Sequence, residues 1–282
     1  MAALVILVVV LGVAWSGIVR KDEGAARAVS ADPLLLFTSL PIYWAEAPDL
    51  AATLNDTAQP HWARRMIETR RVVRPLDTLD ADTLGEAHDL LMAQPRPLSP
   101  AENVALDSWV AGGGRLLLFA DPALTVQSAF ALGDRRRPQD IVLLSPILAR
   151  WGLRLEFDAE QAPGEHTVAL GNEAAIAVNL AGRFVIVPGG RSDVACRLGA
   201  QALMAGCRVG RGTIVALADA ALFEEAPDAM SQAQRRTALG SLLVRAFEQF
   251  CGVCGVDPAA LGKSRVGSGK LAIASLSRTV TR

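Results

Sequence analysis

The sequence has too little net charge and too few aromatic residues for a nucleic-acid-binding protein. Its 282 residues carry a formal net charge of -1, and aromatic residues make up 5% of them. A nucleic-acid interface needs a basic field that holds phosphates and aromatic rings on which bases stack. We therefore expect no nucleic-acid partner. Hydrophobic residues, at 51%, are in turn too abundant for a mainly disordered chain.

The local motifs of common enzymes are also missing. No segment matches the G-x-S-x-G frame of a nucleophile elbow or the G-x-x-x-x-G-K-[ST] phosphate-binding loop. The nearest string to an elbow, 206–210, leads into an expected strand rather than a helix. The three histidines, His61, His88 and His166, all lie outside H-x-E and H-E-x-x-H settings. The sequence thus names no catalytic residue, and we expect neither a metal site nor a cofactor.

Charged side chains are absent from residues 1–19, a length that can cross the hydrocarbon core of a bilayer. We predict a single transmembrane anchor here; the alternatives are a signal peptide and a buried core helix. Residues 20–32 are mostly small and polar, and we interpret them as a tether. Basic residues in the tether would keep the body cytoplasmic by the positive-inside rule, but acidic residues stand among them.

Residues 89–122 predict a complete strand, crossover helix and parallel strand. The apolar run Leu90 to Ala93 suits a strand buried on both faces. Ser99, Pro100 and Glu102 have the spacing of a helical capping box with proline in the first turn, and 112–114 is a run of glycines that ends the helix. The next buried strand, 115–120, ends at Asp121-Pro122.

Strands and helices alternate elsewhere in the chain as well. We expect strands at 33–39, 72–76 and near 212–219, and a long amphipathic helix opened by Ser231. This alternation predicts an α/β fold with a doubly wound, mostly parallel, flavodoxin-like sheet. Short runs at about 153–200 indicate a small antiparallel accessory region. We place the domain at 33–255 and a basic, disordered tail at 256–282.

A ligand or partner site is expected beyond the carboxyl ends of the parallel strands. The polar residues that follow those strands form the candidate rim: Thr38, Ser39, Gln94, Asp121 and Asp219. The two aspartates could act as paired carboxylates or bind a hard cation. The favoured interpretation is structural, because aspartate at the start of a turn commonly accepts hydrogen bonds from backbone amides.

Four cysteines form two local pairs, Cys196 with Cys207 and Cys251 with Cys254. Disulfides would suit an oxidising compartment. The alternatives are a zinc site that uses all four sulfurs and thiol redox chemistry at Cys251 and Cys254. The C-x-x-C sequence follows an expected helix instead of opening one, which argues against a thioredoxin-type site.

The order of these segments resembles the soluble domain of the ABC-type uncharacterised transport system family, which includes GldG-like auxiliary proteins, and related domains with a class I glutamine amidotransferase-like fold. The residues that carry the resemblance are 89–95, Leu98-Ser99 with Glu102, Trp109-Val110 with Gly113-Gly114, 120–122, 145–155, and 210–219 with Leu222-Phe223. The resemblance implies a membrane-tethered domain, usually outside the cytoplasm, that accompanies an ABC permease and ATPase. The catalytic cysteine and histidine of amidotransferases have no counterpart in this sequence.

We therefore expect a non-catalytic auxiliary or binding domain of the cytoplasmic membrane, single-pass, with a periplasmic body. The alternative is a hydrolase or transferase whose site is assembled from distant residues at the carboxyl ends of the strands.

Overall fold

The computed structural model describes residues 30–47, 59–85, 87–171 and 174–248. The predicted anchor, most of the tether, the tail, Cys251 and Cys254 lie outside these residues. The described elements, in chain order, are β1 (Ser30–Thr38), α3 (Trp62–Glu68), β2 (Arg71–Pro75), α4 (Ala81–Leu84), β3 (Asp89–Ala93), α5 (Pro100–Ala111), β4 (Arg115–Phe119), α6 (Ser145–Arg150), β5 (Leu153–Glu156), β6 (His166–Ala169), β7 (Ala175–Val178), β8 (Arg183–Ile186), β9 (Val194–Gly199), β10 (Met204–Val209), β11 (Gly212–Leu217), the short 3-10 helix η1 (Ala221–Phe223), α7 (Ala229–Leu243) and the π-helical turn η2 (Val244–Glu248).

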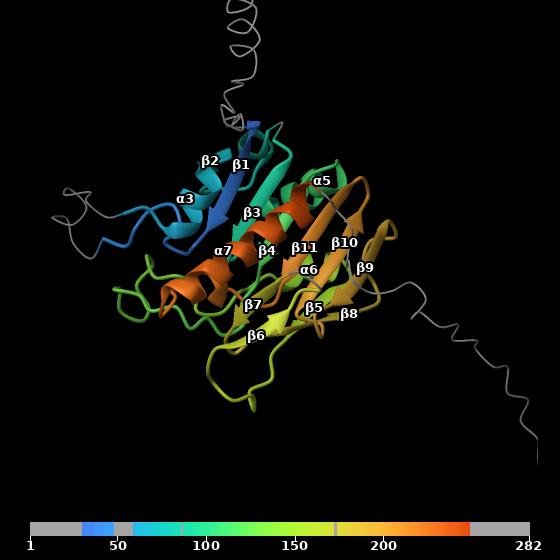
Figure 1. Cartoon of the computed structure of the whole chain (residues 1–282). Coiled ribbons are helices and arrows are strands. Elements are labelled where there is room, and N and C mark those ends of the chain that lie inside the picture. The colour runs from blue at the N-terminus through green and yellow to red at the C-terminus, as the bar shows by residue number, and fades with distance from the viewer. Residues whose placement is uncertain (1–29, 48–58, 86, 172–173, 249–282) are drawn as a thin grey trace, which may run out of the picture.

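A seven-stranded sheet in the order β2-β1-β3-β4-β11-β10-β9 forms the centre of the molecule (Figure 1). Its first five strands are mutually parallel, and β10 pairs antiparallel with β11 and β9. The strands β3 and β11 are buried along their whole length, since helices cover both faces. Helices α3 and α7 contact each other on one face, and α5 and α6 contact each other on the other (Figure 1). The predicted α/β fold with a mostly parallel sheet is confirmed.

The accessory region is confirmed in part. Strands β5 and β8 form one antiparallel pair, and β6 and β7 form another, as the short runs predict. Strand β9 also falls inside the accessory range but belongs to the main sheet, where it forms the edge. It joins this sheet because its residues pair with all six residues of β10.

The predicted strand–helix–strand unit is confirmed, with both hydrogen bonds of the capping box. Ser99 Oγ accepts from the Glu102 amide at 3.2 Å, and a carboxylate oxygen of Glu102 accepts from the Ser99 amide at 2.8 Å. The Arg96 guanidinium binds the same carboxylate, and this contact lowers the pKa of Glu102 to about 2. The first turn of α5 is thereby satisfied locally.

Replacing Ser99 with alanine should lower the free energy of unfolding by about 1 kcal/mol, because the amide of Glu102 loses its partner. Urea unfolding of the purified protein measures this change. Ser108→Ala is the matched control, since Ser108 is exposed in the middle of the same helix. Equal destabilisation by the two substitutions would contradict a capping role for Ser99.

Helix α7 begins at Ala229, with Asp228 rather than the predicted Ser231 as its cap. Asp228 caps it, accepting from the amides of Met230 and Ser231 at 2.8 and 2.9 Å. The Ser231 hydroxyl instead donates to the other carboxylate oxygen of Asp228. Within the described part of the chain, every helix is too short or too polar to cross a bilayer.

Candidate functional site

Neighbouring parallel strands bring most of the predicted rim to one edge of the sheet. Thr38 ends β1, Gln94 follows β3, and Asp121 and Asp219 stand just beyond β4 and β11. These four strands are consecutive in the sheet. The rim residues are therefore spatial neighbours, although up to 181 positions separate them in the chain.

Gln94 connects the ends of β3 and β4. Its side-chain amide donates to the carbonyls of Asp121 at 3.0 Å and Gln139 at 2.7 Å, while its Oε1 accepts from the Asp121 amide at 2.9 Å. The residue is fully buried and has a φ of 44°, a left-handed conformation that is uncommon outside glycine. Gln94 thus holds the ends of β3 and β4 and the loop that contains Gln139 together.

The hydroxyls of Thr38 and Ser39 bind the same backbone. Thr38 Oγ1 donates to the Ala93 carbonyl at 2.6 Å and accepts from the Leu40 amide at 2.9 Å. Ser39 Oγ donates to the Gln94 carbonyl and accepts from the Gln139 amide at 3.0 Å. Both hydroxyls therefore fasten the end of β1 to neighbouring segments.

The two aspartates are fully buried, and backbone amides surround both carboxylates. Asp121 accepts from the amides of Ala123 at 2.8 Å and Ala220 at 2.9 Å. Asp219 accepts from the amides of Asn179 at 2.9 Å and Ala221 at 2.7 Å. The structural interpretation favoured for these residues fits this geometry.

Burial dominates the electrostatics of the pair. Loss of hydration raises the pKa of Asp121 to about 6. Burial, together with the charge of Asp121, raises the pKa of Asp219 well above its usual value. A raised carboxyl pKa is what a general acid requires, but neither side chain is accessible to a substrate.

The described residues contain no cluster of three or more His, Cys, Asp or Glu that could hold a metal ion. His61 has a structural role: Nδ1 accepts from the Ala63 amide at 3.2 Å, so Nε2 carries the proton that it donates to the Phe223 carbonyl at 3.0 Å. Burial lowers the pKa of His61. It therefore stays neutral and holds α3 against η1.

A cavity of about 360 Å³ lies beside the ends of β1 and β2. Thr38 and Ser39 line it, whereas Gln94, Asp121 and Asp219 do not. The remaining polar and aromatic lining comes from three loops, and its main members are Tyr43, Trp44, Glu46, Asp77, Phe130 and Arg136. The structure thus separates the predicted rim into a buried network and a cavity that solvent reaches.

Trp44 is the most exposed aromatic side chain at this cavity, with 71% of its surface accessible. Its ring meets that of Tyr43 edge-on at 4.8 Å, and the Arg64 guanidinium lies 3.9 Å from the centre of the Tyr43 ring. Arg64 also donates to the Tyr43 carbonyl at 2.8 Å. The rim predicted from the sequence did not include Trp44. The feature that could have indicated it is the adjacent pair Tyr43-Trp44, since the chain has one tyrosine and five tryptophans.

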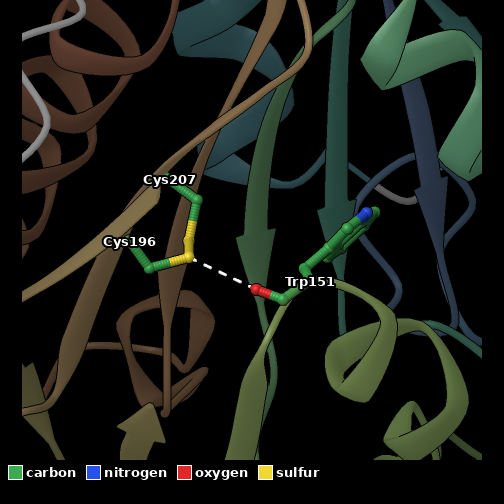
Figure 2. The surroundings of a disulfide bond; sticks show 3 residues. All are labelled: Trp151, Cys196 and Cys207. Carbon is green, nitrogen blue, oxygen red and sulfur yellow. Dashed lines mark hydrogen bonds between the residues drawn. A yellow bond between two sulfur atoms is a disulfide. The ribbon is translucent and has the colours of Figure 1, made fainter. Parts of the chain in front are cut away.

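Cys196 and Cys207 form a disulfide between directly opposite positions of β9 and β10 (Figure 2). Their Cα atoms are 4.1 Å apart, and Cys196 Sγ lies 3.4 Å from the Trp151 carbonyl oxygen. A zinc site that uses all four cysteines is incompatible with this bond, because a zinc ligand must be a free thiolate.

Comparison with solved structures finds domains with a loosely similar arrangement. An exo-beta-1,4-mannosidase from an Opitutaceae bacterium has 15% identity and a TM-score of 0.46, with 77% of this chain and 36% of that chain covered. A putative ThuA-like protein from Bacteroides uniformis has 14% identity and a TM-score of 0.40, with 78% and 92% covered. A cytoplasmic protein from Salmonella typhimurium has 10% identity and a TM-score of 0.41, with 76% and 98% covered.

These TM-scores support no argument about function, and this chain spans about a third of the mannosidase. No match was found among curated protein sequences.

The model of one family, the Domain of unknown function DUF4350, matches residues 61–226. This range includes β2 to β11, and it makes up more than half of the sequence. The chain therefore belongs to the DUF4350 family.

Proposed function

We propose that this protein is a non-catalytic, membrane-anchored auxiliary domain that binds a partner and works with an ABC-type transport system. The observation that carries the proposal is the division of the predicted rim. Gln94, Asp121 and Asp219 are buried and bind backbone groups, whereas the adjacent cavity presents an exposed Trp44. An exposed aromatic ring beside a cavity is typical of a protein-binding surface.

Two features support membrane attachment with the body outside the cytoplasm. The uncharged run 1–19 is long enough for an anchor. The disulfide between Cys196 and Cys207 suits an oxidising compartment such as the periplasm. Association with a permease and an ATPase rests on the resemblance in the order of the chain's segments to the ABC-type family.

Affinity purification of the full-length protein from its own membranes in mild detergent, followed by mass spectrometry, tests the proposal. We expect an ABC permease and ATPase to be enriched. Trp44→Ala should reduce their recovery about tenfold, the effect of losing a central interface aromatic. Met230→Ala is the control, because Met230 is 74% exposed on α7 and does not line the cavity. If the protein is recovered alone while a control complex purified in the same way stays intact, the proposal is refuted.

The enzymatic alternative has one supporting observation, the raised pKa values of Asp121 and Asp219. It also requires a movement that exposes these buried carboxylates. A screen of hydrolase substrates and a metal assay on the same preparation test it. Turnover or stoichiometric metal that disappears in Asp121→Ala would favour the enzyme over the auxiliary domain.

A further inference from the structure

A second cavity, larger than the one that Trp44 lines, lies at the opposite end of the sheet, where β1 begins. Its volume is about 660 Å³. Its apolar lining comes from β1, α3, the end of α7 and η2, with Leu34, Ile67, Leu243, Val244 and Phe247. We call this cavity the amino-end groove.

The amino-end groove also has a charged lining. Asp89 is 1% exposed and binds Arg71 and Arg115, each at 2.5 Å. Arg115 also donates to the Phe247 carbonyl, and Arg71 donates to the Asp32 carbonyl at 3.2 Å. These contacts fix two guanidinium groups beside the apolar lining.

Three further charged side chains lie around the groove. Arg70, Asp32 and Glu248 are exposed and line it. Together with Asp89, Arg71 and Arg115, they give the lining three arginines and three carboxylates, so its formal net charge is zero. Such a lining complements a zwitterion better than it complements an anion.

Gly240 helps to keep the groove open. It lies inside α7, where glycine is less favourable than alanine. A Cβ at this position would stand 3.3 Å from the terminal methyl carbon of Met66, another lining residue. A larger side chain here would therefore project into the space between α3 and α7.

The start of β1 is tied to the predicted anchor. The uncharged run ends at residue 19, and eleven residues, 20–30, lie between it and Ala31 of β1. Fully extended, they span at most about 40 Å, so the amino-end groove must stay close to the membrane surface that the anchor enters. The end of the sheet where β1 begins is also the end at which the chain enters the body (Figure 1).

We infer that the amino-end groove binds a zwitterionic membrane phospholipid with an amine headgroup. The phosphate lies against the guanidinium groups of Arg70 and Arg71, and the ammonium lies near the exposed carboxylates. The first methylenes of the acyl chains pack on Leu243, Val244 and Phe247. This inference rests on the membrane anchoring in the proposed function.

Native mass spectrometry of the full-length protein, delipidated in detergent and mixed with phosphatidylethanolamine or phosphatidylglycerol, tests the inference. We expect one phosphatidylethanolamine to be retained with several-fold preference over phosphatidylglycerol. Gly240→Leu should weaken retention about tenfold by filling the groove, and Arg70→Gln about threefold by removing an exposed cation. The controls Gln234→Leu and Arg236→Gln change exposed residues of α7 that do not line the groove, and they should retain lipid like the wild type.

Equal lipid retention in the wild type, Gly240→Leu and Arg70→Gln would overturn the assignment of the groove. A preference for phosphatidylglycerol would overturn the headgroup assignment. Arg70→Gln changes an exposed side chain, so it keeps the test decisive if Gly240→Leu does not fold. Carbonate extraction of native membranes tests anchoring separately: an anchored protein that retains no lipid refutes only this inference.

Discussion

Reduction of the Cys196–Cys207 disulfide should lower the free energy of unfolding by about 3 kcal/mol, as expected for a closed loop of this size. The two cysteines are 11 positions apart and join the edge strand β9 to β10. Within the main sheet β9 pairs only with β10, so one set of backbone hydrogen bonds and the disulfide join it to the sheet, while Val194 and Leu198 pack against the core. Loss of the disulfide should therefore also increase amide hydrogen exchange in β9 more than in β3.

Urea unfolding with and without dithiothreitol measures the difference. The experiment uses the Cys251→Ser/Cys254→Ser variant, in which Cys196 and Cys207 are the remaining cysteines. A Cys196→Ala/Cys207→Ala variant should match the reduced protein and be insensitive to the reductant. If the oxidised and reduced forms unfold at the same urea concentration, the disulfide contributes no stability.

The buried aspartate pair should make the protein less stable as pH rises from about 4 to above 6. The pKa of Asp121 is raised from its ordinary value to about 6, and that of Asp219 is raised as well. Between the unfolded and folded pKa values, the native state binds more protons than the unfolded state, so stability falls as pH increases. The raised pKa of Asp121 alone lowers the free energy of unfolding by ~3 kcal/mol. This loss is complete above pH 6, and it is absent below the pKa that Asp121 has in the unfolded chain.

The Asp121→Asn/Asp219→Asn variant isolates this effect. Asparagine cannot accept from backbone amides at both of its terminal atoms, so the variant should be less stable than the wild type at pH 4. The difference in free energy of unfolding between the wild type and the variant should shrink by ~3 kcal/mol or more at pH 7, because the variant has no carboxylates to ionise at these positions. Asp82→Asn, which removes an exposed carboxylate on α4, should keep the wild-type dependence on pH. Parallel stability curves for the wild type and the double variant would refute the raised pKa values.

Local signals made the strand–helix–strand unit predictable. Ser99, Pro100 and Glu102 specify the start of α5 through hydrogen bonds that reach three residues at most. The apolar runs of β3 and β4 specify strands buried on both faces, because a strand with one solvated face would alternate. The cap of α7 was misplaced because Asp228 and Ser231 are both good capping residues, and Asp228 is the one whose carboxylate meets the free amides.

The candidate site was predictable only to the level of the sheet edge. The sequence indicated which residues follow the strands, and parallel strands place those residues at one edge. Whether each side chain faces backbone or solvent depends on segments far away in the chain: the amides that surround Asp121 and Asp219 come in part from residues 99 and 40 positions away. A contact between residues so far apart in the chain cannot be predicted from the periodicity of the sequence.

By itself, the sequence determined the five parallel strands, their alternation with helices and hence the α/β class, because periodicity and capping are local properties of the chain; α3, β9 and β10 were not predicted. The tertiary structure alone decided that β9 joins the main sheet, that Trp44 rather than Asp121 faces a cavity, and that the amino-end groove exists. Gly212 illustrates the reason: a Cβ there would overlap the carbonyl oxygens of Val110 and Gly114. That requirement arises from packing of segments about 100 residues apart, which only the folded chain brings into contact.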